Sequence, residues 1–184
     1  MRTLVAAATA LALLGTGCGP GPTIEDYGSQ LETRVTAYAA EHDDLAAQHL
    51  SGLERAIAEL ERTQEGEALA AAAVGVTAQR SAALIAAVGD ALDRLQAGLT
   101  EIEAPGPVVD AHRAFIDAIG RASEGTGPLV DRLANATSFD EMDRMLSGSA
   151  YADAGPRLHA ACERLQEAIA DQGVTVDLRC GSVR

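Results

Sequence analysis

Apolar side chains recur every three or four residues along most of this sequence, and that spacing constrains the fold more than any other feature. In the first long stretch, with a small phase shift before Ala46, the repeat falls on these positions: Ile24, Tyr27, Leu31, Val35, Tyr38, His42, Ala46, Leu50, Leu53, Ile57 and Leu60. Side chains at this spacing share one face of an α-helix, which turns once in about 3.6 residues. Helices hide such faces against one another, so we expect an all-α protein.

The composition favours the same fold class. The chain has no Trp, two Phe and three Tyr, whereas Ala, Leu and Glu are abundant. Such usage is typical of helices that pack through small and aliphatic side chains, and it is poor for sheets. At 184 residues, less a removable leader, the chain has room for one domain with its own core.

Two long helices are expected first, at about 24–63 and 67–103. Pro105 and Pro107 end the second, because proline lacks the amide hydrogen that a helix interior needs. The Ala-rich stretch 68–88 is apolar enough to resemble a transmembrane helix, but polar residues interrupt it. We expect this stretch to pack closely inside the protein instead.

The rest of the chain predicts two interrupted helices that begin near Pro107 and Ser138, with Gly173 as the final cap. Gly and Pro predict kinks near 125–128 and 148–156. If each interrupted pair counts as one rod, four rods with short connections form an up-down-up-down four-helix bundle with a short extended C-terminal tail. If the second break lets the last helix pack separately, the bundle has five helices.

The first 17 residues have the parts of an export signal. Arg2 is followed by an apolar run of about 11 residues, Leu4 to Leu14, and by small residues ahead of Cys18. A helix needs roughly 20 residues to cross a bilayer, so this run is too short for a permanent span. We expect the leader 1–17, a Gly/Pro-rich linker at 18–23 and a helical domain at 24–184.

A glycine and Cys18 after a leucine-rich run resemble the lipobox of bacterial lipoproteins. The resemblance implies that the leader is removed and that Cys18 carries acyl chains such as palmitate. The protein would then be tethered to a bacterial membrane in the cell envelope, facing the periplasm or the exterior. The usual leucine is replaced by Gly15, which leaves an ordinary secretory signal as the alternative. Segments 107–115 and 161–180 also resemble uncharacterised helical lipoproteins, which implies no activity.

The two remaining cysteines are expected to form a disulfide. If Cys18 is lipidated, Cys162 and Cys180 are left, an even number that suits an oxidising compartment. A bridge between them would hold the apolar segment 174–178 on the last helix and contribute about 3 kcal/mol in the chain-entropy account. The alternative is two free thiols, one of them buried.

The charge of the chain limits its partners. The formal net charge is -13, and the sequence contains no Lys. Phosphate binding needs clustered cations, so we expect no nucleic-acid partner. There is also no polybasic patch for anionic lipid headgroups. The expected partners are the membrane, through the lipid anchor, and an unidentified protein or small molecule.

Two of the four histidines, His42 and His112, fall on predicted apolar faces and are candidate ligands for a metal or haem. His42 and His49 are roughly 10 Å apart along a helix, too far to share an ion. The Glu-x-x-His and Cys-x-x-Cys-His motifs are absent from the sequence. We therefore expect histidines that hydrogen-bond at the edge of the core, and no cofactor.

No other pattern predicts chemistry. Met142 and Met145 have the spacing of packing residues, and Glu41, Asp43 and Asp44 point away from one another on a helix. The sequence lacks a Gly-x-Ser-x-Gly elbow, and no nucleophile has a recognisable base, so we expect no enzyme. The leading hypothesis is a non-enzymatic binding or interaction module. The alternatives are a metal- or cofactor-binding bundle and a chaperone-like protein with an exposed apolar patch.

Overall fold

The computed structural model describes residues 21–182 and contains no β-strand among them, which confirms the all-α expectation. The leader 1–17 and Cys18 lie outside the described residues. The helices are α1 (Ile24–Thr63), α2 (Gly66–Thr100), α3 (Val109–Glu124), α4 (Thr126–Leu133), α5 (Phe139–Ser147) and α6 (Ala150–Ala170), with the short 3-10 turns η1 (Gly106–Val108) and η2 (Cys180–Ser182). The predicted bounds of the first two helices are accurate to within a turn.

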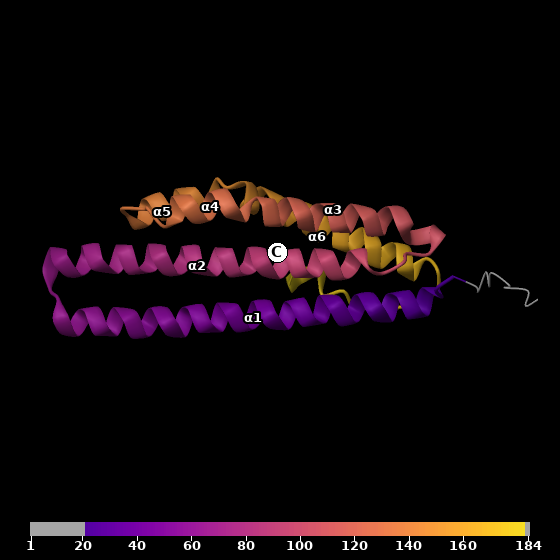
Figure 1. Cartoon of the computed structure of the whole chain (residues 1–184), viewed down its shortest axis with the longest axis horizontal. Coiled ribbons are helices and arrows are strands. Elements are labelled where there is room, and N and C mark those ends of the chain that lie inside the picture. The colour runs from indigo at the N-terminus through magenta and orange to yellow at the C-terminus, as the bar shows by residue number, and fades with distance from the viewer. Residues whose placement is uncertain (1–20, 183–184) are drawn as a thin grey trace, which may run out of the picture.

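Helices α1 and α2 form a long antiparallel hairpin (Figure 1). With 40 residues, α1 is about 60 Å long. The hydroxyl oxygen of Thr23 caps its start, accepting a hydrogen bond from the backbone of Asp26 at 3.1 Å. The chain then reverses over Gln64 and Glu65, which is possible because Gly66 adopts a φ of 58°.

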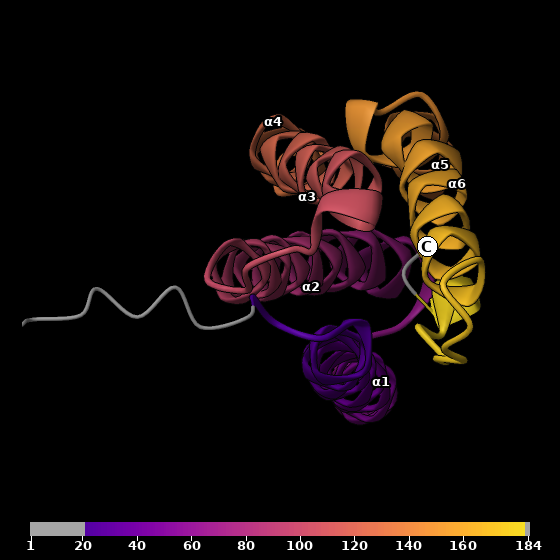
Figure 2. The same cartoon turned by 90° about the vertical axis from the view of Figure 1, so that its right-hand side faces the viewer.

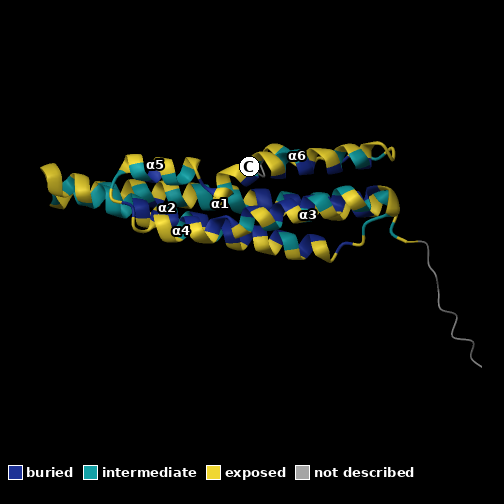
Figure 3. Ribbon diagram, turned by 90° about the horizontal axis from the view of Figure 1, so that it is seen from above, coloured by how far each residue is buried: buried dark blue, intermediate teal, exposed yellow. Residues whose placement is uncertain are grey.

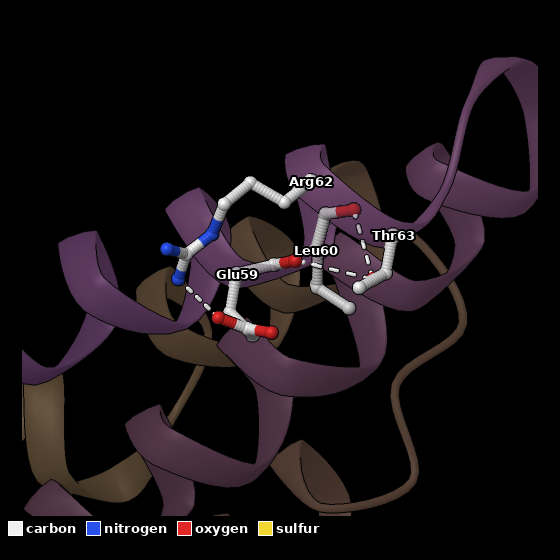
Figure 4. Close-up of polar contacts among 4 residues, drawn as sticks. All are labelled: Glu59, Leu60, Arg62 and Thr63. Carbon is white, nitrogen blue, oxygen red and sulfur yellow. Dashed lines mark hydrogen bonds and ion pairs between the residues drawn. The ribbon is translucent and has the colours of Figure 1, made fainter.

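The end of α1 is stabilised by local bonds (Figure 4). The hydroxyl of Thr63 donates to the carbonyl oxygens of Glu59 and Leu60, at 3.1 and 3.3 Å. Arg62 forms an ion pair with the side chain of Glu59. These contacts all lie within α1 and satisfy carbonyl oxygens of its last turn.

Helix α2 is the central element. Figure 2, an end-on view, shows α1 on one side of it, α3 and α4 on the other and α6 along the flank. Its buried residues are Ala78, Ala82, Ile85, Val88, Gly89, Ala91, Leu92, Leu95, Gly98 and Leu99. Because many of these side chains are small, the neighbouring helices can approach the α2 backbone closely.

The core has two parts that meet along α2. The larger cluster joins the first half of α1, the second half of α2, α3, α6 and the C-terminal tail, with Tyr27, Phe115 and Leu165 fully buried. The smaller cluster joins α2 to α4 and α5 and includes Leu133 and Met142. Met142 is therefore a packing residue, as its spacing predicted.

The far part of the hairpin, residues 40–77, is thinly covered, and we call it the hairpin tip. Gly52 is the one buried residue within it, and Leu50 is 59% exposed. Figure 3 shows this end in the colours of exposed and intermediate residues. The prediction that the stretch 68–88 packs closely inside the protein is wrong for its first half, because every residue from 68 to 77 is exposed or only partly buried.

By length and composition, α2 could cross a membrane, and it is the one helix in residues 21–182 that meets this criterion. Only 22% of its most apolar window is buried. An Ala-rich helix in the core of a water-soluble protein satisfies the same criterion, so this property assigns no location to the chain.

The predicted kink near 125–128 is a one-residue interruption at Gly125, whose φ of -70° and ψ of -18° remain helical. Helix α3 ends at Glu124 and α4 begins at Thr126. The break at Gly125 lies against the start of α6, where a Cβ at this glycine would come within 2.7 Å of the backbone nitrogen of Tyr151. Close approach of two backbones therefore requires glycine here.

The second predicted kink, at 148–156, is a shorter interruption than expected. Helix α5 ends before Gly148, and the hydroxyl of Ser149 caps α6 by accepting from the backbone of Ala152 at 3.0 Å. Pro156 lies inside α6 and not in a loop. Residues 21–182 thus form six α-helices, and α6 packs against α3 within the bundle.

The C-terminal segment 174–179 has no regular secondary structure, but it belongs to the core. Gly173, with a φ of 83°, turns the chain back after α6. Leu178 is fully buried, and Val176 packs so close to Gly28 that a Cβ there would lie 2.8 Å from it. The backbone of Leu178 donates to the side chain of Gln166 at 3.0 Å. The predicted extended tail is therefore a packed element.

A disulfide ends this segment, in agreement with the predicted pairing. The sulfur atoms of Cys162 and Cys180 are 2.06 Å apart, and the Cα atoms are 5.5 Å apart. Cys162 is fully buried in α6, so the bridge fixes the tail directly to the core.

Replacing both cysteines, Cys162→Ala and Cys180→Ala, is expected to lower the free energy of unfolding by about 3 kcal/mol, because the open tail regains chain entropy in the unfolded state. Urea titration of the leaderless protein measures this loss. A reducing agent should destabilise the original protein and leave the double variant unchanged. Equal stability of the original protein with and without reductant would contradict the prediction.

Candidate functional site

A groove lies where α1, α2, α3 and α6 meet, with a volume of about 410 Å³. Its lining residues are Tyr38, Leu92, Ala122, Tyr151, Ala152, Gly155, Pro156, Leu158 and His159. Most of them are apolar, and three carry polar groups on their side chains. Sites for small molecules commonly have this size and a mostly apolar wall with a few polar groups.

The groove exists because α6 presents small residues toward its neighbours. A Cβ at Gly155 would meet no heavy atom within 4 Å, so the space beside this residue is open. Ala152 and Ala122 fill little of it from α6 and α3. Pro156 has no amide hydrogen, so the carbonyl oxygen of Ala152 loses its usual helical donor at the groove wall. The start of α6 thus leaves both space and a polar backbone group at the site.

Tyr38 of α1 is the most buried polar side chain of the groove. The residue is only 5% exposed, and its hydroxyl makes no hydrogen bond within residues 21–182. Every fully buried side-chain nitrogen or oxygen among these residues has a hydrogen-bond partner. The Tyr38 hydroxyl has none, so it keeps some accessible surface. Because Tyr38 lines the groove, we place that surface there. Burial raises the pKa of Tyr38, and nearby Tyr151 and Glu41 raise it further, so the phenol stays neutral.

Tyr151, near the start of α6, supplies a second phenol. It is half-buried and packs against both core clusters. Burial raises the pKa of this tyrosine as well. Its hydroxyl likewise has no hydrogen-bond partner among the described residues. Two neutral hydroxyls from different helices therefore remain unpaired at one groove.

His159, the third polar residue of the groove, is held in place on both sides. Its Nδ1 lies 2.9 Å from the backbone carbonyl oxygen of Cys180, which can only accept, so Nδ1 donates. Its Nε2 lies 3.2 Å from a carboxylate oxygen of Glu163, an ion pair when the ring is protonated. The disulfide-linked tail thus orients a groove residue.

The two candidate metal ligands do not meet. The Nδ1 atom of His112 lies 2.8 Å from the hydroxyl of Tyr27, whereas His42 lies beside Tyr38, with 6.1 Å between ring centroids. Tyr27 and His42 are 15 positions apart on α1, roughly 22 Å along its axis. Within residues 21–182, no three His, Cys, Asp or Glu side chains are grouped as metal ligands. A shared ion site at His42 and His112 is therefore not formed.

The acidic cluster that follows Tyr38 is spread over the surface. Glu41 pairs with Arg94 of α2, while Asp43 and Asp44 are exposed. Its members therefore do not converge, as the helical spacing predicted.

His112 has a structural role. It is buried, and its ring packs edge-on against Tyr27 with 5.5 Å between centroids. Burial lowers the pKa of His112, and the backbone carbonyl of Leu99 offsets part of that effect. A neutral ring can accept the hydrogen of the Tyr27 hydroxyl, so the pair joins α1 to α3 through a satisfied buried hydrogen bond.

Sequence reasoning did not identify the groove or its two tyrosines. Tyr38 was assigned to a core face, and Tyr151 lay in a segment expected to be a kink. The one signal was the cluster of Gly155, Pro156 and small neighbours within the final helical stretch, since such residues leave space beside a helix.

The lowered pKa of His112 predicts a pH dependence of stability. The unfolded histidine binds a proton below about pH 6.5, whereas the buried ring resists it, so stability falls as the pH drops below that value. In the variant His112→Gln, this loss of stability at low pH should disappear. Urea unfolding between about pH 5 and pH 8 measures how the free energy of unfolding changes with pH. An equal change with pH in the two proteins would show that His112 is not the group responsible.

Comparisons with known proteins assign no family to the chain. No protein-family model, no curated protein and no solved structure matches it. The function is therefore inferred from the groove and the sequence features described above.

Proposed function

We propose that the chain is an exported bacterial lipoprotein whose helical domain is a non-enzymatic binding module, and that the groove takes a small, largely apolar ligand. The observation that supports this most is the groove itself, an apolar hollow of about 410 Å³ bounded by four helices. Filling it with an apolar molecule would remove carbon surface from water on both partners, which drives such binding.

The polar groups of the groove favour binding over catalysis. Its two phenols stay neutral, and both ring nitrogens of His159 already have partners. Nucleophilic or acid–base catalysis needs a nucleophile with a base within hydrogen-bond reach, and the groove residues do not supply that pair. Hydroxyls and apolar walls are sufficient to hold and orient a ligand.

The proposed topology of the domain is an up-down-up-down bundle. In it, α3 with α4 and α5 with α6 each act as one broken rod beside the hairpin of α1 and α2. The contacts of α2 with α1, α3 and α4, and of α3 with α6, support this arrangement. The groove then lies at a seam of the bundle, where interhelical ligand sites are common.

The proposed lipid anchor would place the groove near a membrane. Cys18 is three residues from the first described residue, a distance of at most about 11 Å along the chain. From Ile24, the start of α1, Tyr38 is roughly 21 Å away along the helix axis, and the end of the hairpin roughly 60 Å. A ligand in the groove would thus lie close to the lipid surface, with the hairpin tip extending away from it.

The anchor is testable in the full chain. Expressed in a bacterium fed with radiolabelled palmitate, the protein is expected to carry the label and to fractionate with membranes. The variant Cys18→Ala should lose both properties, because the thiol that would carry the lipid is gone. A soluble, unlabelled original protein would refute the proposed anchor and would favour an ordinary secretory signal.

Ligand binding is testable with a filled groove. The neutral fluorophore N-phenyl-1-naphthylamine is expected to bind the leaderless protein with increased emission, and Gly155→Leu should weaken it at least about tenfold, since the added side chain occupies the open space. The matched control is Gly75→Leu, because a Cβ at Gly75 also meets nothing within 4 Å but lies outside the groove.

Ala152→Leu is a second groove-filling variant in case Gly155→Leu unfolds. Circular dichroism and urea unfolding establish that each variant is folded before binding is compared. Unchanged probe affinity in both folded groove variants would rule out this groove as the site.

A further inference from the structure

The hydroxyls of Tyr38 and Tyr151 restrict what the groove can hold. They come from α1 and α6, and both tyrosines line the groove. Neither hydroxyl has a hydrogen-bond partner among the described residues, and Tyr38 is only 5% exposed. Because no fully buried side-chain oxygen among residues 21–182 lacks a partner, both hydroxyls keep accessible surface and can donate to a ligand.

The surroundings of the hydroxyls disfavour a charged ligand. Glu41 lies near Tyr38 and opposes any second negative charge there. The nearby ionisable groups already have partners: Glu41 pairs with Arg94, and His159 pairs with Glu163. Among the described residues that line the groove, no cation therefore remains free to neutralise a carboxylate or phosphate, and the chain as a whole has a formal charge of -13.

The remaining walls suit a carbon skeleton. Leu92 of α2, Leu158 of α6 and the exposed ring of Pro156 surround the two phenols. A ligand that only filled these walls would leave both hydroxyls without an acceptor. A ligand with one carbonyl oxygen could accept from both hydroxyls, since that oxygen has two lone pairs.

We propose that the groove binds an uncharged, mainly apolar molecule that carries a carbonyl-type acceptor, such as an ester, amide or ketone, to which Tyr38 and Tyr151 donate hydrogen bonds. This inference rests on the proposed binding function and adds the chemical class of the ligand. The tyrosines are specificity residues in this account, and the apolar walls supply most of the affinity.

Two neutral naphthalene probes distinguish the contribution of the hydroxyls to binding from that of the apolar walls. The ketone probe is 6-propionyl-2-dimethylaminonaphthalene, whose emission shifts to longer wavelength when its carbonyl accepts hydrogen bonds, and the probe without a carbonyl is N-phenyl-1-naphthylamine. In the double variant Tyr38→Phe, Tyr151→Phe the ketone probe should bind about tenfold more weakly and emit at shorter wavelength, because two donors are lost. The affinity of the second probe should change less than about twofold.

Folding is controlled by circular dichroism and urea unfolding, and Tyr151→Phe alone serves if the double variant does not fold, because Tyr151 is only half-buried. If the folded variants bind the ketone probe with unchanged affinity and emission, this inference is overturned. The binding function still stands in that case, provided that Gly155→Leu blocks the binding of both probes. If Gly155→Leu and Ala152→Leu affect neither probe, the binding function itself fails.

The anionic probe 8-anilinonaphthalene-1-sulfonate tests the neutral character of the ligand. It is expected to bind at least about tenfold more weakly than the ketone probe, because the described residues that line the groove include no free cation to pair with the sulfonate. Equal or tighter binding of the sulfonate, blocked by Gly155→Leu, would show that the groove accepts anions and would contradict the proposed ligand class.

Discussion

The burial of α2 between α1 on one side and α3 and α4 on the other is the constraint on which the rest of the structure depends. Half of its buried positions are alanine or glycine, so three neighbours can approach its backbone, and Leu92, Leu95 and Leu99 supply the larger apolar area. Where α6 and the disulfide-linked tail add a further wall, the core is closed. Beyond the reach of α3 to α6, the two helices of the hairpin cover only each other, and the tip stays exposed.

The groove follows from the same packing. Helix α6 closes the larger cluster with bulky residues in its second half, such as Leu165 and Ile169, but its first half presents Ala152 and Gly155. The side chains that face them, such as Leu92 of α2 and Ala122 of α3, do not fill the space left by these small residues, and a hollow remains beside Tyr38. The hollow, and with it the proposed function, is therefore a consequence of which residues α6 places at its start.

The sequence predicted most of the helices, because their apolar repeat and capping residues are local signals. It did not predict the groove, because Tyr38 and Tyr151 are far apart in the chain and only tertiary packing brings them together. Pro156 was misplaced because a proline within a helical pattern predicts an interruption, whereas α6 continues through it. The exposed tip was not predicted, because the apolar composition of the stretch 68–88 does not show how far the neighbouring helices extend along it.

Amide hydrogen exchange followed by mass spectrometry tests the central claim, the uneven burial of the hairpin, most directly. The account predicts slow exchange in residues 24–39 of α1 and 78–99 of α2, which face the closed core. Exchange in the tip should be much faster, because local unfolding there breaks few buried contacts. Uniformly slow exchange along both helices, including residues 40–77, would contradict the account, because it would mean that the whole hairpin is equally covered.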